Sequence, residues 1–209
     1  MPIRYSIQSS VVDILKDTPS PSDSFFVDTN IWFWITYTKA SSCANPPKIY
    51  QIQDYPNYIN AALKTRAKLY RCGLSLPELS HIIEKSEREI YENNHGVTLS
   101  PKEYRHNFPS ERATTVNEIE VSWNQVKSMS DLHDITIDEQ KCCNLIQLIK
   151  GTCIDGYDAF LTIQEQTLDP NFKIITDDGD FSSIPDIIVF TSNKSIIRAA
   201  NGAGKLITR

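Results

Sequence analysis

Two short apolar runs in this chain end in aspartate, and they constrain its fold more than any other feature. Phe25-Phe26-Val27 leads into Asp28, and Ile174-Ile175-Thr176 leads into Asp177-Asp178. Short continuous apolar runs are typical of parallel strands that are buried on both faces. Because ligands bind beyond the carboxyl ends of such strands, we expect both acidic ends to face one crevice.

Helical patterns alternate with these runs and predict an α/β fold with helices on both faces of a mainly parallel central sheet. The chain of 209 residues is expected to form a single domain, with a polar helical insertion at about 86–134. A further strand is expected at 186–190. The expected helices lie at 11–15, from 29, at 58–70 with Gly73 as the stop, from 75, and at 138–150, 155–168 and 193–200.

The charge balance excludes several classes of protein. The chain has 21 Lys and Arg against 26 Asp and Glu, a formal net charge of -5, and 40% hydrophobic residues. These values argue against a disordered tail, a collagen-like fibre and a cationic protein that coats nucleic acid. A nuclease with acidic metal ligands stays compatible with them.

The sequence predicts a cytoplasmic protein without a membrane segment. Its longest aliphatic and aromatic run, 31–35, is far shorter than the ~18 residues of a spanning helix, and the N-terminus lacks the apolar core of a secretion signal. The five cysteines contain no C-x-x-C pair and are expected to be reduced packing residues.

Acidic residues are placed where several expected elements begin or end. Asp28, Asp178 and Asp180 follow strands, whereas Glu78 and the pair Asp155 and Asp158 lie in the first turns of helices. Converging carboxylates repel one another unless a cation is bound. Mg²⁺ and Mn²⁺ prefer such oxygen ligands and leave positions open for a phosphate.

These residues resemble the PIN-domain ribonuclease family, which includes the VapC toxins of toxin-antitoxin pairs. The resemblance rests on four motifs in the family's order: Phe26-Val27-Asp28-Thr29-Asn30, Ser75-x-x-Glu78-Leu79, Asp158-Ala159 and Thr176-x-Asp178-x-Asp180-Phe181. It covers 24–38, 72–84 and 155–192. It implies a three-layer α/β/α PIN-like fold.

The resemblance also implies a divalent-metal-dependent endoribonuclease that hydrolyses RNA phosphodiester bonds. One or two Mg²⁺ or Mn²⁺ ions would bridge the carboxylates and the scissile phosphate. The implied partners are an RNA substrate, an antitoxin or other inhibitory protein, and a second copy in a homodimer. The implied catalytic and metal residues are Asp28, Glu78, Asp158 and Asp178, with Asp180 as an auxiliary metal ligand and Asn30 and Thr176 as supporting residues.

Several of these residues also have plain structural interpretations. Ser75 and Glu78 match a helix capping box, and Asp177 is expected to face solvent. Asp155 is expected to be either a helix cap or the metal ligand in place of Asp158. The aromatic run 32–34 fits a core or a dimer interface better than a base-stacking surface. The basic stretch 64–71 fits a solvated face or phosphate contacts.

Two other functions were weighed against the nuclease. A catalytically silent PIN-like module would bind RNA or a protein through the 86–134 region. An aspartate-phosphorylating phosphotransferase with a D-x-D motif would need an acid where this chain has Asn30. The acidic set therefore favours the metal-dependent nuclease.

Overall fold

The structure is a computed structural model that describes residues 3–133, 136, 138–168 and 172–209. Within these residues, seven strands form one sheet in the order β4-β3-β2-β5-β6-β1-β7, and every neighbouring pair is parallel. No helix in this described part is long and apolar enough to span a membrane. The strands are β1 Ser10–Asp13, β2 Ser24–Val27, β3 Lys68–Cys72, β4 Asp131–His133, β5 Lys173–Ile175, β6 Ile188–Thr191 and β7 Leu206–Ile207.

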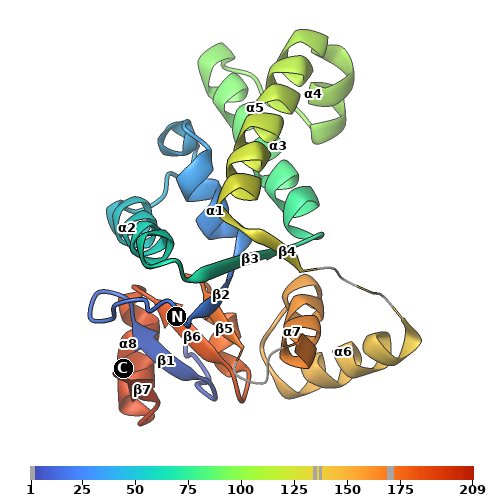
Figure 1. The fold of residues 1–209 in the computed structure, drawn as a ribbon. Helices are drawn as coiled ribbons and strands as arrows, with labels where there is room; N and C mark the ends of the chain where they lie inside the picture. The colour runs from blue at the N-terminus through green and yellow to red at the C-terminus, as the bar shows by residue number, and fades with distance from the viewer. Residues whose placement is uncertain (1–2, 134–135, 137, 169–171) are drawn as a thin grey trace.

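Helices cover both faces of the sheet, as the alternating pattern predicts (Figure 1). Helices α1, α2, α3 and α5 pack on one face, and α7, α8 and a short 3-10 helix, η2, pack on the other. The bounds are α1 Thr29–Thr36, α2 Ile49–Thr65, α3 Ser75–His95, α4 Pro101–Asn107, α5 Pro109–Met129, α6 Glu139–Gly151, α7 Gly156–Leu168, α8 Lys194–Gly202, η1 Ala40–Ser42 and η2 Asp180–Ser183.

Alternation along the central strands builds the two cores. On β2, Phe25 and Val27 join the core under α1 and α2, while Phe26 joins the core under α7 and α8. On β5, Ile175 and Ile174 divide in the same way. Burial on both faces explains why these strands are continuously apolar.

Two predicted helices differ from the structure. Val11 and Val12 lie on a strand, β1, where they fill opposite cores. The helix expected at 58–70 ends at Thr65, because Arg66 adopts a left-handed conformation (φ 63°) that terminates it. Leu69 therefore lies on β3 and packs in the sheet.

The predicted helical region 86–134 contains the end of α3, all of α4 and α5, and strand β4; residue 134 itself lies outside the described residues. Helices α3, α4 and α5 rise together away from the sheet (Figure 1). Val126 of α5 is fully buried, with Ile119 and Trp123 packed on the same core. Ser100 and Glu103 form a capping box at the start of α4.

Candidate active site

The candidate site begins at the carboxyl end of β2, where Asp28 is 5% exposed. Asp28 is the N-cap of α1, and its Oδ1 accepts a 3.3 Å hydrogen bond from the backbone N–H of Asn30. Its Oδ2 accepts a 2.6 Å hydrogen bond from the hydroxyl of Thr176, which directly follows β5. The carboxylate therefore has one fixed orientation. Thr176 supports the site through its side chain, and Asn30 through its backbone.

The loop after β5 carries the next two acids. The backbone N–H of Asp178 donates to the Thr176 hydroxyl oxygen at 2.9 Å, and the N–H of Asp180 donates to Asp178 Oδ1 at 2.8 Å. Asp180 then begins η2. This chain of hydrogen bonds connects the loop to Asp28 through a single threonine.

Glu78 reaches the same region from the first turn of α3. The predicted capping box is absent: the helix is capped by Leu74 without a side-chain hydrogen bond, and the Ser75 hydroxyl accepts from the N–H of Cys72 instead. The Glu78 carboxylate accepts a hydrogen bond from the side chain of Thr29. This hydrogen bond directs the Glu78 carboxylate toward the N-terminus of α1, where Asp28 is the cap.

Asp158 lies in the first turn of α7, and its neighbour Asp155 is the helix cap. Asp155 Oδ1 accepts from the N–H groups of Tyr157 at 2.9 Å and Asp158 at 3.1 Å. The structure thus confirms the capping role expected for Asp155. Asp158 is the acid of this pair whose carboxylate does no capping.

The electrostatics of the acids show that they lie close to one another. Burial, and then repulsion from Asp28, Asp155, Glu78 and Asp178, raises the pKa of Asp158. Burial and the charges of Glu78 and Asp178 also raise the pKa of Asp28, although the Thr176 hydrogen bond opposes this effect. Such mutual repulsion favours either a bound proton or a cation.

Other acids of the set show the same effect. Burial, followed by the charges of Asp155 and Asp178, raises the pKa of Glu78 against the Thr29 hydrogen bond. Burial and the charge of Asp178 raise the pKa of Asp180. The chemistry of this all-oxygen donor set fits a hard divalent cation. Nevertheless, among the residues that the structure describes, no three His, Cys, Asp or Glu side chains are already grouped as ligands of one ion.

Asp177 does not face solvent, and that prediction is wrong. Its carboxylate accepts hydrogen bonds from Tyr50 (3.0 Å), Gln51 (2.7 Å) and Tyr55 (2.7 Å), all on α2. The backbone carbonyl of Asp177 also accepts from the side chain of Asn193. Asp177 therefore anchors the acidic loop to α2 and α8, while the charge of Asp178 acts on Asp28, Glu78 and Asp158.

The N-terminal segment also contacts the acidic loop and the short helix that follows it. The N–H groups of Gln8 and Ser9 donate to the carbonyl of Ser182, at 2.8 and 3.1 Å. The Tyr5 ring lies so close to Gly179 that a β-carbon there would overlap it. Burial, and then the charges of Asp178, Asp180 and Asp177, raise the pKa of Tyr5. No strand or helix period identifies such a contact.

The aromatic and basic residues mostly have structural roles. Trp32 and Phe33 are buried in the core, so these two rings are not available for a dimer interface or for base stacking. Arg71 is buried, donates to the carbonyl of Ser130 and lies over the Trp123 ring. The other basic residues of that stretch, Lys64, Arg66 and Lys68, are exposed.

No protein-family model and no curated protein matches the sequence. Among solved structures, the chain is similar to the crystal structure of VapBC2 from Rickettsia felis bound to a DNA fragment from their promoter. The sequence identity is 14% and the TM-score is 0.48, over 80% of this chain and 98% of that chain. The α/β class of this chain follows from its own seven described parallel strands.

Proposed function

We propose that this chain is a divalent-metal-dependent endoribonuclease whose acidic site is formed by Asp28, Glu78, Asp158 and Asp178, with Asp180 as an auxiliary ligand. One observation supports the proposal: acids from the end of β2, the loop after β5 and the first turns of α3 and α7 act on one another electrostatically at the carboxyl edge of the sheet. None of the ion pairs among the described residues includes one of these five carboxylates.

A bound Mg²⁺ or Mn²⁺ would offset the carboxylate repulsion and polarise a phosphodiester of RNA. Hydrogen bonds from neighbouring residues orient the acids of the site. Thr176 fixes Asp28, the cap at Asp155 fixes the first turn of α7, and Thr29 holds Glu78. The N-termini of α1, α3 and α7 also direct their positive dipole ends toward the acids they carry, which favours negative charge there.

The protonation of the acids supports the same proposal. Because burial and repulsion raise the pKa of Asp28 and Asp158, the acids retain protons more readily than acids in water. A divalent cation would displace those protons when it binds. Cation affinity is therefore expected to increase with pH across the range in which these acids titrate.

The proposed activity can be tested with purified protein, Mn²⁺ or Mg²⁺ and structured RNA. We expect Asp28→Asn to slow cleavage by at least about 100-fold, because removing a group that stabilises developing charge has an effect of this size. Asp186→Asn is the matched control. Asp186 is exposed and has φ 60°, a conformation that asparagine adopts readily. Equal cleavage by the wild type and Asp28→Asn would refute the site.

We extend the proposal to a toxin that is restrained by an inhibitory partner protein, on the basis of the resemblance in sequence motifs. Expression of the wild type in a bacterial host should arrest growth, and expression of Asp28→Asn should not. Growth arrest by both proteins would show that the effect does not depend on the acidic site.

A catalytically silent RNA- or protein-binding module is the second candidate. The observation in its favour is that no three potential ligands among the described residues are already grouped around one point. A silent module would show no rise in melting temperature with Mn²⁺, whereas a metal-binding enzyme would be stabilised by the cation.

A further inference from the structure

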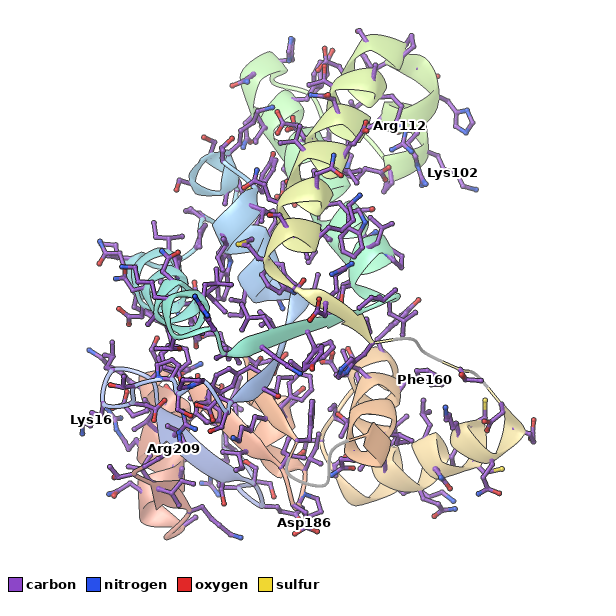
Figure 2. The ribbon with its side chains drawn as sticks, viewed as in Figure 1. Lys16, Lys102, Arg112, Phe160, Asp186 and Arg209 are labelled. Carbon is purple, nitrogen blue, oxygen red and sulfur yellow. The ribbon has the colours of Figure 1, made fainter. Side chains whose placement is uncertain are left out.

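An apolar hollow of about 350 Å³ lies between α6 and α7, and its volume is within the range of ligand sites. Two of its walls are aromatic: Tyr157 and Phe160, both on α7. Figure 2 labels Phe160 on α7, near α6. The remaining lining residues are Leu74, Cys142, Leu145 and Gly156.

The hollow lies at the N-terminal ends of two helices, α3 and α7, that carry acids of the candidate site. Tyr157 immediately precedes Asp158, and the Asp155 cap holds the backbone N–H groups of both residues. On the other wall, Leu74 caps α3, the helix that carries Glu78 in its first turn. The hollow therefore adjoins the first turns that carry Glu78 and Asp158.

One aromatic side chain that lines the hollow is largely exposed. The Tyr157 side chain is 68% exposed, although an aromatic ring stabilises a fold or an interface most when it is buried. RNA has two kinds of surface to offer: charged phosphates, which an apolar hollow does not favour, and flat apolar bases. Proteins that bind unpaired strands stack those bases on exposed aromatic side chains.

We propose that this hollow binds an unpaired nucleobase, with Tyr157 as the stacking residue, next to the phosphodiester held at the acids. The proposal rests on the proposed nuclease function and makes its substrate single-stranded at this point. It also gives an acidic chain of net charge -5 an attraction for RNA that does not depend on lysine or arginine.

Binding of an oligouridylate 12-mer, measured in Mn²⁺ on an Asp28→Asn background so that the strand stays intact, tests the stacking directly. Tyr157→Ala should weaken binding by roughly 5- to 150-fold, the effect of losing one stacked base, and Tyr157→Phe should stay within about threefold of the parent. The control is Ile146→Ala, because Ile146 is 51% exposed on α6 and does not line the hollow. An Ile146→Ala variant should bind like the parent.

A second measurement locates the base in the hollow. Cys142 lines it, whereas Cys153 does not, and both thiols are free and exposed. Oligouridylate should slow the alkylation of Cys142 by iodoacetamide, read by mass spectrometry, and leave Cys153 unaffected. A 12-mer of abasic ribose phosphates carries the same charge and should protect neither. Equal protection by the two oligomers would overturn the proposal.

The results separate this proposal from the nuclease proposal. If wild-type protein cleaves RNA and Tyr157→Ala leaves KM unchanged, the base site is refuted and the nuclease stands. If nothing is cleaved but oligouridylate binding depends on Tyr157, the base site stands without the nuclease. If Tyr157→Ala instead abolishes self-association in sedimentation and leaves RNA binding unchanged, the hollow is a protein interface and the base site is refuted.

Discussion

The hydroxyl of Thr176 donates a 2.6 Å hydrogen bond to Asp28 Oδ2 and accepts a 2.9 Å hydrogen bond from the N–H of Asp178. A single buried threonine thus connects acids at the ends of β2 and β5, which are adjacent strands. Because the register between these strands is fixed by Phe26 opposite Ile174 and Val27 opposite Ile175, the sheet itself sets the relation between the two acids.

Thr176→Val should remove the donor to Asp28 while keeping the volume of the side chain. The buried carboxylate then loses a hydrogen bond, and we expect the free energy of unfolding to fall by about 1–3 kcal/mol. The pKa of Asp28 should also rise, since this hydrogen bond is the largest effect that lowers it. Urea unfolding measures the first effect. Thr176→Ser keeps the hydroxyl and should behave like the wild type; equal losses in both variants would contradict this role.

The metal-free protein should lose stability as the pH rises from about 4 to 9. Burial and repulsion raise the pKa of Asp28 to about 7 and of Asp158 to about 9, whereas both residues have a pKa near 4 when unfolded. Over this range the folded state binds more protons than the unfolded state, so the free energy of unfolding falls with pH.

Urea unfolding at pH 5, 7 and 9 in EDTA tests this dependence. Asp158→Asn has no proton to lose at this position, so its stability relative to the wild type should increase with pH up to about 9. Added Mn²⁺ should recover the wild type at high pH. A constant difference between the two proteins at all three pH values would contradict the assigned environment of Asp158.

Asp177→Asn should affect the fold rather than the proposed chemistry. The carboxylate accepts hydrogen bonds from Tyr50, Gln51 and Tyr55. In asparagine, one of the two oxygens is replaced by an NH₂ group, which cannot accept a hydrogen bond from these donors. We expect a loss of about 1–3 kcal/mol in the free energy of unfolding. Asp178→Asn keeps the oxygen that accepts from Asp180 and should cost less stability. Greater destabilisation by Asp178→Asn would reverse the assigned roles.

Gly179→Ala should displace the N-terminal segment, because the added β-carbon overlaps the Tyr5 ring. The energetic cost should be much smaller in a Tyr5→Ala background, where the ring is gone. A double-mutant cycle measured by urea unfolding should give a coupling energy of about 0.5–3 kcal/mol. Additive effects would show that Tyr5 does not pack on Gly179 in solution.

Much of the fold could be predicted because buried strands and amphipathic helices leave different periods in the sequence. The apolar runs before Asp28 and Asp177 indicate strands, and the structure confirms both. The helix predicted at Val11 and Val12 is wrong because a four-residue strand buried on both faces has no period that separates it from a helix. Arg66 gave no signal, since a left-handed helix end is usually marked by glycine or asparagine.

The acids of the candidate site could be predicted from the sequence, but the residues that contact and orient the acidic loop could not. Aspartates at strand ends follow from the topology of parallel sheets. The contact of Tyr5 with Gly179, and the hydrogen bonds from α2 to Asp177, join residues more than 100 positions apart and depend on packing. At Glu78 a local motif misleads instead: the capping-box pattern is present in the sequence, but its hydrogen bonds are not made in the structure.

Calorimetric titration of Mn²⁺ into the metal-free protein at pH 7.5 tests the central claim most directly. The wild type and Asp186→Asn should bind the cation with the same affinity, with protons released from the acids whose pKa is raised. Asp28→Asn should bind at least about tenfold more weakly, as expected when one carboxylate ligand is replaced by a neutral amide. Absence of binding by the wild type, or unchanged affinity in Asp28→Asn, would contradict the metal site.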